Sequence, residues 1–119
     1  MCGRAKRPLL KEVSPALAAE LERLLRKEGD SDLAEQVSEL QVVQTCGCGD
    51  DVCASFYTAP HRKGTPWGPD HYTMVLEADR WTHLHIDVVD RVIVYVEVLD
   101  GDDVREELRS AGFTLEPHQ

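Results

Sequence analysis

WTHLHIDVVDRVIVYVEVL, residues 81–99, is the stretch that decides the fold, because it predicts two long strands joined by a tight turn. Apolar side chains recur at every second position along residues 84–88 and again along residues 92–98. Valine and isoleucine, which favour strands, dominate the second run. The other predicted elements are placed relative to this pair.

The apolar side chains of the two strands set the expected register. A three-residue loop at residues 89–91 places Val88 opposite Val92 and Leu84 opposite Val96. A two-residue loop would instead set Leu84 against Glu97 and lose the burial of an apolar pair. Since a slip of one residue exchanges the two faces of a strand, we expect the three-residue loop.

A third strand, over about residues 71–77, precedes this hairpin. A loop at residues 78–80 places Met74 opposite Leu84 and Tyr72 opposite Ile86. One face of the three strands then collects ten apolar side chains, which we expect the helices to cover. They are Tyr72, Met74, Leu76, Leu84, Ile86, Val88, Val92, Val94, Val96 and Val98.

Two amphipathic helices are predicted before the strands. Ser14 is a good N-cap, Pro15 suits the first helical position, and Gly29 is a natural end for the first helix. Asp30 and Ser31 then begin a second helix that runs to about residue 40. Their apolar positions follow helical spacing at Leu17, Leu21, Leu24 and Leu25 in the first, and at Leu33, Val37 and Leu40 in the second.

Two shorter β-prone runs, residues 41–46 and 53–58, flank a tip rich in Gly and Asp and predict a hairpin. A last helix begins at Asp102 or Asp103 and ends at Gly112. We therefore expect an α+β fold: an N-terminal helical hairpin, a five-stranded mainly antiparallel sheet and a C-terminal helix. Residues 1–13 are expected to be a flexible lead-in, and residues 14–116 a single domain.

The composition narrows the class of partner. The 119 residues include 13 basic and 22 acidic side chains, for a net charge of −9, which disfavours nucleic acid and anionic membranes. No run approaches the roughly 20 apolar residues that span a bilayer, and no apolar segment of a secretory signal follows the N-terminus. We expect a soluble cytoplasmic protein, whose clustered cysteines favour metal or redox chemistry over structural disulfides.

CGCGDDVC, residues 46–53, is the strongest candidate for a site. The thiols of Cys46, Cys48 and Cys53 lie within eight residues at a Gly-rich turn, which resembles half of a zinc knuckle. A closed structural zinc site requires a fourth ligand. His61 is the first candidate for that ligand, followed by His71 and Cys2.

The same cysteines allow two other interpretations. Cys46 and Cys48 form a C-x-C pair that could cycle as a disulfide resolved by Cys53. Asp50 and Asp51 would raise the thiol pKa values, whereas reactive cysteines need an electropositive setting, so metal binding is favoured over redox. The third interpretation is that the thiols are unligated and the small residues serve a tight turn.

HLHID, residues 83–87, is the second candidate. Alternation places His83, His85 and Asp87 on one face of a strand, with neighbours about 7 Å apart. The string resembles the start of the H-x-H-x-D-H motif of the metallo-β-lactamase superfamily. Val88 stands where that motif has its last histidine, and the chain is too short for the αββα sandwich, so we do not assign the family.

The face that carries HLHID has three interpretations. In the expected register Glu97 lies opposite His83 and Tyr95 opposite His85, so a metal site is possible. Alternatively, the face is simply polar and solvated, as one face of an antiparallel sheet often is. In the third interpretation its apolar members form a dimer or partner surface: Trp81, Tyr95, Ile93 and Leu99.

From these patterns we expect a non-enzymatic interaction module with a structural zinc at Cys46, Cys48, Cys53 and His61, acting through a protein partner or as a homodimer. One alternative is a small metal-dependent enzyme or ligand-binding protein that uses the face of His83, His85 and Asp87. The other is a thiol-redox protein that uses the Cys-Gly-Cys pair.

Overall fold

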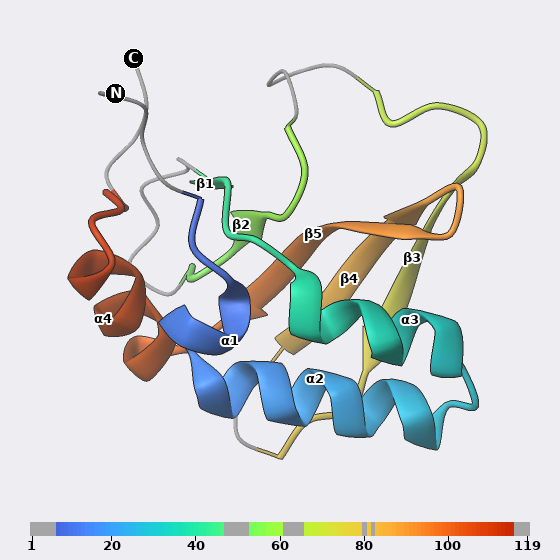
Figure 1. Cartoon of the computed structure of the whole chain (residues 1–119), viewed down its shortest axis with the longest axis horizontal. Coiled ribbons are helices and arrows are strands. Elements are labelled where there is room, and N and C mark those ends of the chain that lie inside the picture. The colour runs from blue at the N-terminus through green and yellow to red at the C-terminus, as the bar shows by residue number, and fades with distance from the viewer. Residues whose placement is uncertain (1–6, 47–52, 61–65, 80, 82, 116–119) are drawn as a thin grey trace.

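A computed structural model describes residues 7–46, 53–60, 66–79, 81 and 83–115 (Figure 1). It confirms the expected α+β fold, with N-terminal helices, a five-stranded antiparallel sheet and a C-terminal helix. In chain order the elements are α1 (Leu10–Val13), α2 (Pro15–Lys27), α3 (Ser31–Gln36), the 3-10 turn η1 (Val37–Glu39), β1 (Gln44–Thr45), β2 (Phe56–Tyr57), β3 (His71–Leu76), β4 (His83–Val89), β5 (Val92–Leu99) and α4 (Asp102–Ser110).

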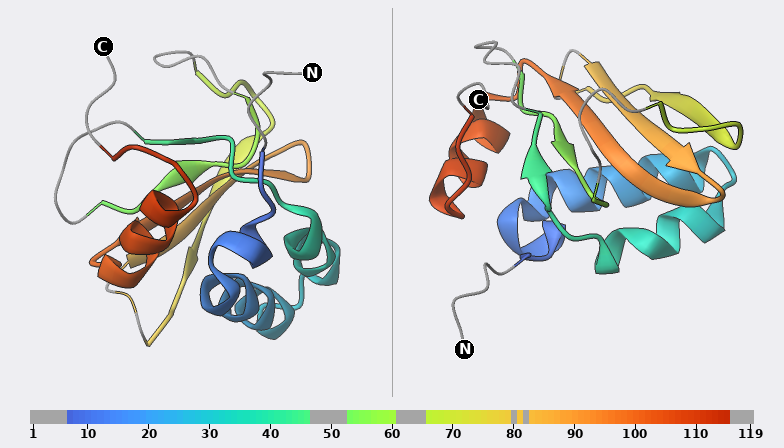
Figure 2. Two further views of the ribbon diagram at one scale, coloured as in Figure 1. Left: turned by 60° about the vertical axis from the view of Figure 1, so that its left-hand side comes forward. Right: turned by 90° about the horizontal axis from the view of Figure 1, so that it is seen from above.

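The sheet has the strand order β1-β2-β5-β4-β3, and each neighbouring pair is antiparallel. Helices α1, α2 and α3 lie along one face of the sheet, and α4 packs beside α1 near the end of β5 (Figures 1 and 2). The helices thus gather on one side, and we call the other side of the sheet the open face.

Strand β4 shows why the two faces differ. Its buried residues Leu84, Ile86 and Val88 alternate with the half-exposed His83, His85, Asp87 and Val89. The buried set joins a core that also holds Leu17, Leu21, Leu25 and Phe56, all of them almost completely buried. Alternation along a strand therefore separates the core from the polar side chains of the open face.

The helices begin and end largely where the sequence predicts. Pro15 stands at the start of α2, and Gly29, with a φ of 84°, follows its end. All four predicted apolar positions of α2 are buried. The second helix is shorter than expected, because α3 ends at Gln36 and the chain continues as the 3-10 turn η1.

The packed part of the chain begins before residue 14, where we expected its boundary. Leu10–Val13 forms the short helix α1, and Leu10 and Val13 lie in the core. Their spacing of three residues brings both side chains to the same side of a helical turn. The backbone of Leu10 is also held, because its N–H donates to the carbonyl of Leu40 at 2.7 Å.

The expected register between β4 and β5 was wrong. Val89 pairs with Val92, so the loop has two residues, Asp90 and Arg91. Both have positive φ, 49° and 65°, as a type I′ turn requires.

A β-bulge restores the apolar pairing that a two-residue loop would have lost. Asp87 pairs with Tyr95 and Val88 with Ile93, which leaves Val94 as the extra residue on β5. Leu84 consequently faces Val98 rather than Glu97. The two-residue turn places Ile93 in the core opposite Val88 and leaves Val92 51% exposed, the reverse of what the sequence predicts for these two residues.

The register between β3 and β4 was wrong by two residues. Met74 pairs with Ile86 and Tyr72 with Val88, because the connection between these strands is longer than residues 78–80. A shift by an even number of residues keeps each side chain on its predicted face. Trp81 was expected on the face of the histidines, but it lies in the core, and its Nε1 donates to the Asp103 carboxylate at 3.1 Å.

A glutamine ties the β4–β5 turn to the helical layer. The Gln36 side-chain nitrogen donates to the Arg91 carbonyl at 2.6 Å, and its oxygen accepts from the Ile93 N–H at 3.0 Å. Arg91 also pairs with Asp32, but their side chains are 68% and 69% exposed, so this ion pair contributes little to stability. The turn is therefore held mainly by the hydrogen bonds between the Gln36 side chain and its backbone.

We predict that Arg91→Gly is more stable than Arg91→Ala, although both remove the ion pair with Asp32. A left-handed backbone costs a non-glycine residue about 1–2 kcal/mol, and the greater unfolded-state freedom of glycine offsets part of that gain. The net difference should be about 0.5–1 kcal/mol in favour of glycine. Denaturant unfolding of the two variants measures it, and equal stabilities would contradict a turn with positive φ at Arg91.

Candidate metal site

Three side chains of the open face converge on one point. His83 and His85 project from β4, and Glu97 projects from β5 directly opposite His85. One potential ligand atom from each of the three residues lies within 4.8 Å of the other two. This His83–His85–Glu97 triad is the one such group within the described residues.

The two imidazoles lie unusually close together. Alternate residues of a strand are about 7 Å apart at Cα, yet the ring centroids of His83 and His85 are 3.5 Å apart, with an interplanar angle of 41°. The rings therefore lean toward each other instead of standing parallel on the sheet.

The Nε2 atom of His83 is buried and has no hydrogen-bond partner among the described residues. It lies 3.1 Å from a Glu97 carboxylate oxygen, within ion-pair distance, but the angles do not form a hydrogen bond. A buried nitrogen without a partner is destabilising, and a cation shared by this nitrogen and the carboxylate oxygen beside it would satisfy both.

The surroundings of His85 favour its neutral form. Burial lowers the pKa of His85, and the neighbouring His83 lowers it further, whereas the carboxylates of Glu97 and Asp87 act in the opposite direction. A neutral imidazole is the form that binds a metal ion. The triad can therefore offer His85 as a ligand near neutral pH.

Asp87, which the sequence places with the two histidines, is engaged elsewhere. Its Oδ1 lies 2.9 Å from His71 Nε2 and accepts a hydrogen bond from the Thr73 hydroxyl at 2.6 Å. The predicted set of His83, His85 and Asp87 is therefore corrected to His83, His85 and Glu97. The sequence shows Glu97 on this face, but only the true register places it opposite His85.

The predicted cysteine site lies partly outside the described residues. Cys48, Asp50, Asp51, His61 and Cys2 belong to the undescribed segments. Cys46 is half-buried, Cys53 is buried, and no disulfide links the two. The proposed zinc site of Cys46, Cys48, Cys53 and His61 thus remains a prediction. His71, an alternative fourth ligand, lies instead beside Asp87.

An aromatic cluster covers the end of the open face next to Asp87. Tyr57 of β2 packs against Tyr95 of β5, with ring centroids 4.6 Å apart, and Trp67 lies 6.1 Å from Tyr57. The rings of Trp67 and His71 also lie 6.2 Å apart, so the segment just before β3 packs over the sheet. Burial raises the pKa of Tyr95, and a hydrogen bond with Cys46 adds to the effect.

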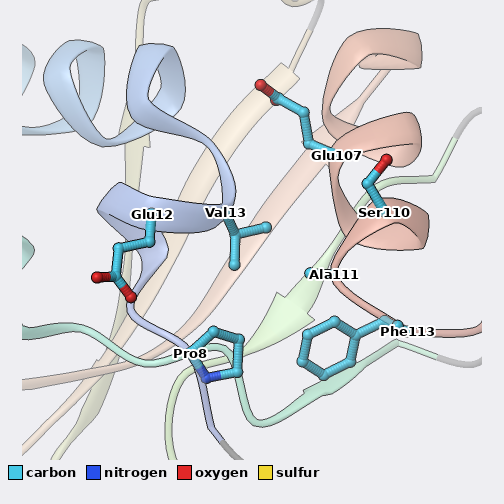
Figure 3. A pocket seen from close by; sticks show the side chains of 8 residues that line it. Pro8, Glu12, Val13, Glu107, Ser110, Ala111 and Phe113 are labelled. Atoms are coloured by element: carbon cyan, nitrogen blue, oxygen red, sulfur yellow. The ribbon is translucent and has the colours of Figure 1, made fainter.

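Two hollows lie away from the triad. One, of about 600 Å³, separates α1 from α4 and is lined by Val13, Glu107 and Phe113 among others (Figure 3). Glu107 is held there by the Ser14 hydroxyl, which donates to it at 2.7 Å. The second, of about 580 Å³, lies beside α3 and Val92. Neither hollow is lined by a residue of the triad.

Comparison with protein families, with curated proteins and with solved structures gives no match to this chain. Among the described residues, no helix is long and apolar enough to cross a membrane.

We predict that the free energy of unfolding falls as the pH rises above about 10, the ordinary pKa of tyrosine. The pKa of Tyr95 is raised in the folded protein, so the unfolded chain releases this proton first and gains stability from doing so. In Tyr95→Phe the decline should be shallower. Denaturant unfolding at about pH 9 and pH 11 measures the free energy of unfolding of both proteins. Both contain the same cysteines, so titration of the thiols does not distinguish them. Equal declines in the two proteins would contradict a buried phenol at Tyr95.

Proposed function

We propose that the protein binds a divalent transition metal, with zinc as the expected ion, through His83, His85 and Glu97 on the open face of the sheet. The observation that carries this proposal is the buried, unbonded Nε2 of His83, 3.1 Å from a carboxylate oxygen and beside a second imidazole. The expected function is that of a metal-dependent ligand-binding protein, one of the alternatives that the sequence leaves open.

The spacing of the triad suits zinc. Ligand atoms at about 2.0–2.1 Å from a tetrahedral zinc lie about 3.3 Å from one another. The separation of 3.1 Å between His83 Nε2 and the Glu97 oxygen is close to that value. The remaining pairs lie within 4.8 Å, so side-chain rotations of modest size bring all three atoms onto one ion.

An ordinary ion pair explains the triad less well. A protonated His83 beside Glu97 would place a cation next to the ring of His85, 3.5 Å away between centroids. It would also form a hydrogen bond if its N–H pointed at the carboxylate, and the geometry does not provide one. A metal ion satisfies both imidazoles and the carboxylate at once, and the net charge of −9 favours a cation.

Three protein ligands leave one position of a tetrahedral ion open. Some catalytic zinc sites have this composition, with two histidines and a glutamate as protein ligands and water in the fourth position. Structural zinc sites are instead closed by four protein ligands. The triad lies on the face of the sheet that the helices leave uncovered (Figure 2), and the side chains of His83 and Glu97 are 26% and 39% exposed, so a small ligand can approach them. We therefore expect the fourth position to take water or an exogenous anion.

The test is zinc binding by calorimetry to protein freed of metal with a chelator. We expect one equivalent of zinc to bind at the triad of the wild type. His85→Ala and His83→Ala should each weaken binding by more than about a hundredfold, since even residues outside the first coordination shell change affinity by about 10–100-fold. Glu97→Gln should also weaken it, because an amide is a poorer zinc ligand than a carboxylate.

His71→Ala is the matched control, because it removes a histidine of the same face that is paired with Asp87 rather than with the triad. It should leave zinc affinity unchanged. A Cys46→Ser variant separates this proposal from the predicted cysteine site. If His85→Ala binds zinc as tightly as the wild type while Cys46→Ser loses it, the triad is not the metal site.

A further inference from the structure

Strand β3 forms the long free edge of the sheet. It ends the strand order, so its outer side pairs with no described strand, and it spans six residues, His71–Leu76. The opposite edge, β1, has only two residues, Gln44–Thr45. Long exposed edges are templates for pairing with another strand, whereas very short ones are protected.

The features that usually protect an edge strand are missing from β3. Its sequence, HYTMVL, contains no lysine, no proline and no acidic residue, and its pairing with β4 runs without a bulge. Two of the three large apolar side chains that are exposed among the described residues lie on it, Val75 at 64% and Tyr72 at 44%. The edge is thus neutral, regular and partly apolar.

The hydrogen bonds to β4 determine which backbone groups remain available. The Asp90 N–H donates to the Asp70 carbonyl at 3.3 Å, in the register that continues the β3–β4 pairing. In an antiparallel ladder, bonded residues alternate along the strand. Tyr72, Met74 and Leu76 therefore bond to β4, and His71, Thr73 and Val75 direct their N–H and C=O groups outward.

We propose that two copies of the chain pair through β3 as an antiparallel dimer, with a two-fold axis at Thr73. A symmetric register must bring outward-directed residues opposite each other. Centring it on Thr73 pairs His71 with Val75 of the second copy and Thr73 with its own counterpart. The two sheets then form one continuous sheet with about six new backbone hydrogen bonds.

This register suits the side chains and charges at the edge. Tyr72 faces Met74 of the second copy, a contact between an aromatic ring and a thioether that is individually favourable. Asp70 falls opposite Leu76, and Glu77 opposite Pro69, so no like charges meet directly. The two-fold axis stands perpendicular to the sheet, so both open faces lie on the same side of the dimer.

The dimer should be weak and depend on salt. Pairing along six residues buries less than the roughly 800 Å² per partner of a standard interface, so we expect a dissociation constant in the micromolar range or above. Each copy carries a net charge of −9, and their repulsion is screened as ionic strength rises. Dimerisation does not depend on the proposed metal site, because it uses backbone groups of a different strand.

Sedimentation velocity of the wild type over a range of concentrations tests this pairing. We expect a monomer–dimer equilibrium that shifts toward the dimer at higher salt. Val75→Pro removes an outward N–H without breaking a bond to β4, and it should raise the dissociation constant at least about tenfold. Val75→Thr keeps that N–H and a β-branched side chain, so it should dimerise like the wild type. Circular dichroism and thermal unfolding confirm that both variants are folded.

Oxidative cross-linking tests the register itself. Residues in a bonded antiparallel pair have Cα atoms about 5.5 Å apart, within disulfide range, so the Thr73→Cys variant should cross-link two copies through its introduced thiols. In the Val75→Cys variant the two introduced thiols lie about 14 Å apart and should not link. The linked peptides are identified by mass spectrometry against the oxidised wild type.

Three results would overturn the proposal. One is a monomer at all concentrations and salt levels, and another is a dimer that Val75→Pro does not weaken. The third is a disulfide-linked Val75→Cys variant together with an unlinked Thr73→Cys variant, which would exclude the register centred on Thr73. Binding of a separate extended peptide to an edge that stays monomeric would assign β3 to a different partner.

Discussion

Strict alternation of apolar and polar side chains along β4 is the constraint on which the rest of the structure depends. Leu84, Ile86 and Val88 face the helices and are buried, and His83, His85 and Asp87 face away from them. A slip of one residue would bury imidazoles and expose the core, so the hydrophobic effect that drives α2 and α3 against the sheet also fixes where the histidines lie. The core and the candidate site are two consequences of one pattern.

The turn and the bulge convert this alternation into a site. A two-residue turn alone would pair Leu84 with Glu97. The extra residue at Val94 shifts the register so that Leu84 pairs with Val98. The same adjustment places Glu97 opposite His85, which brings a carboxylate to the two imidazoles. Positive φ at Asp90 and Arg91, tied down by Gln36, is therefore a condition of the triad as well as of the hairpin.

The sequence was sufficient for features that depend on periodicity. The apolar face of α2 and the two faces of β4 follow from spacings of about 3.6 and 2 residues. The predicted β4–β5 register was wrong, because a bulge is a local choice of backbone that leaves no mark in the alternation of residue types. Asp87 seemed a ligand because alternation places it on the same face as His83 and His85, but His71 and Thr73 of β3 engage its carboxylate. Trp81 was misplaced because its partner, Asp103, lies on a distant helix.

A metal ion held by the His83–His85–Glu97 triad has only nitrogen and oxygen in its first coordination shell. X-ray absorption spectroscopy of protein loaded with one equivalent of zinc tests this most directly. We predict a shell of nitrogen and oxygen atoms at about 2.0–2.1 Å, with the multiple-scattering signature of two imidazoles. A sulfur shell at about 2.3 Å would instead assign the ion to the cysteines and contradict the central claim.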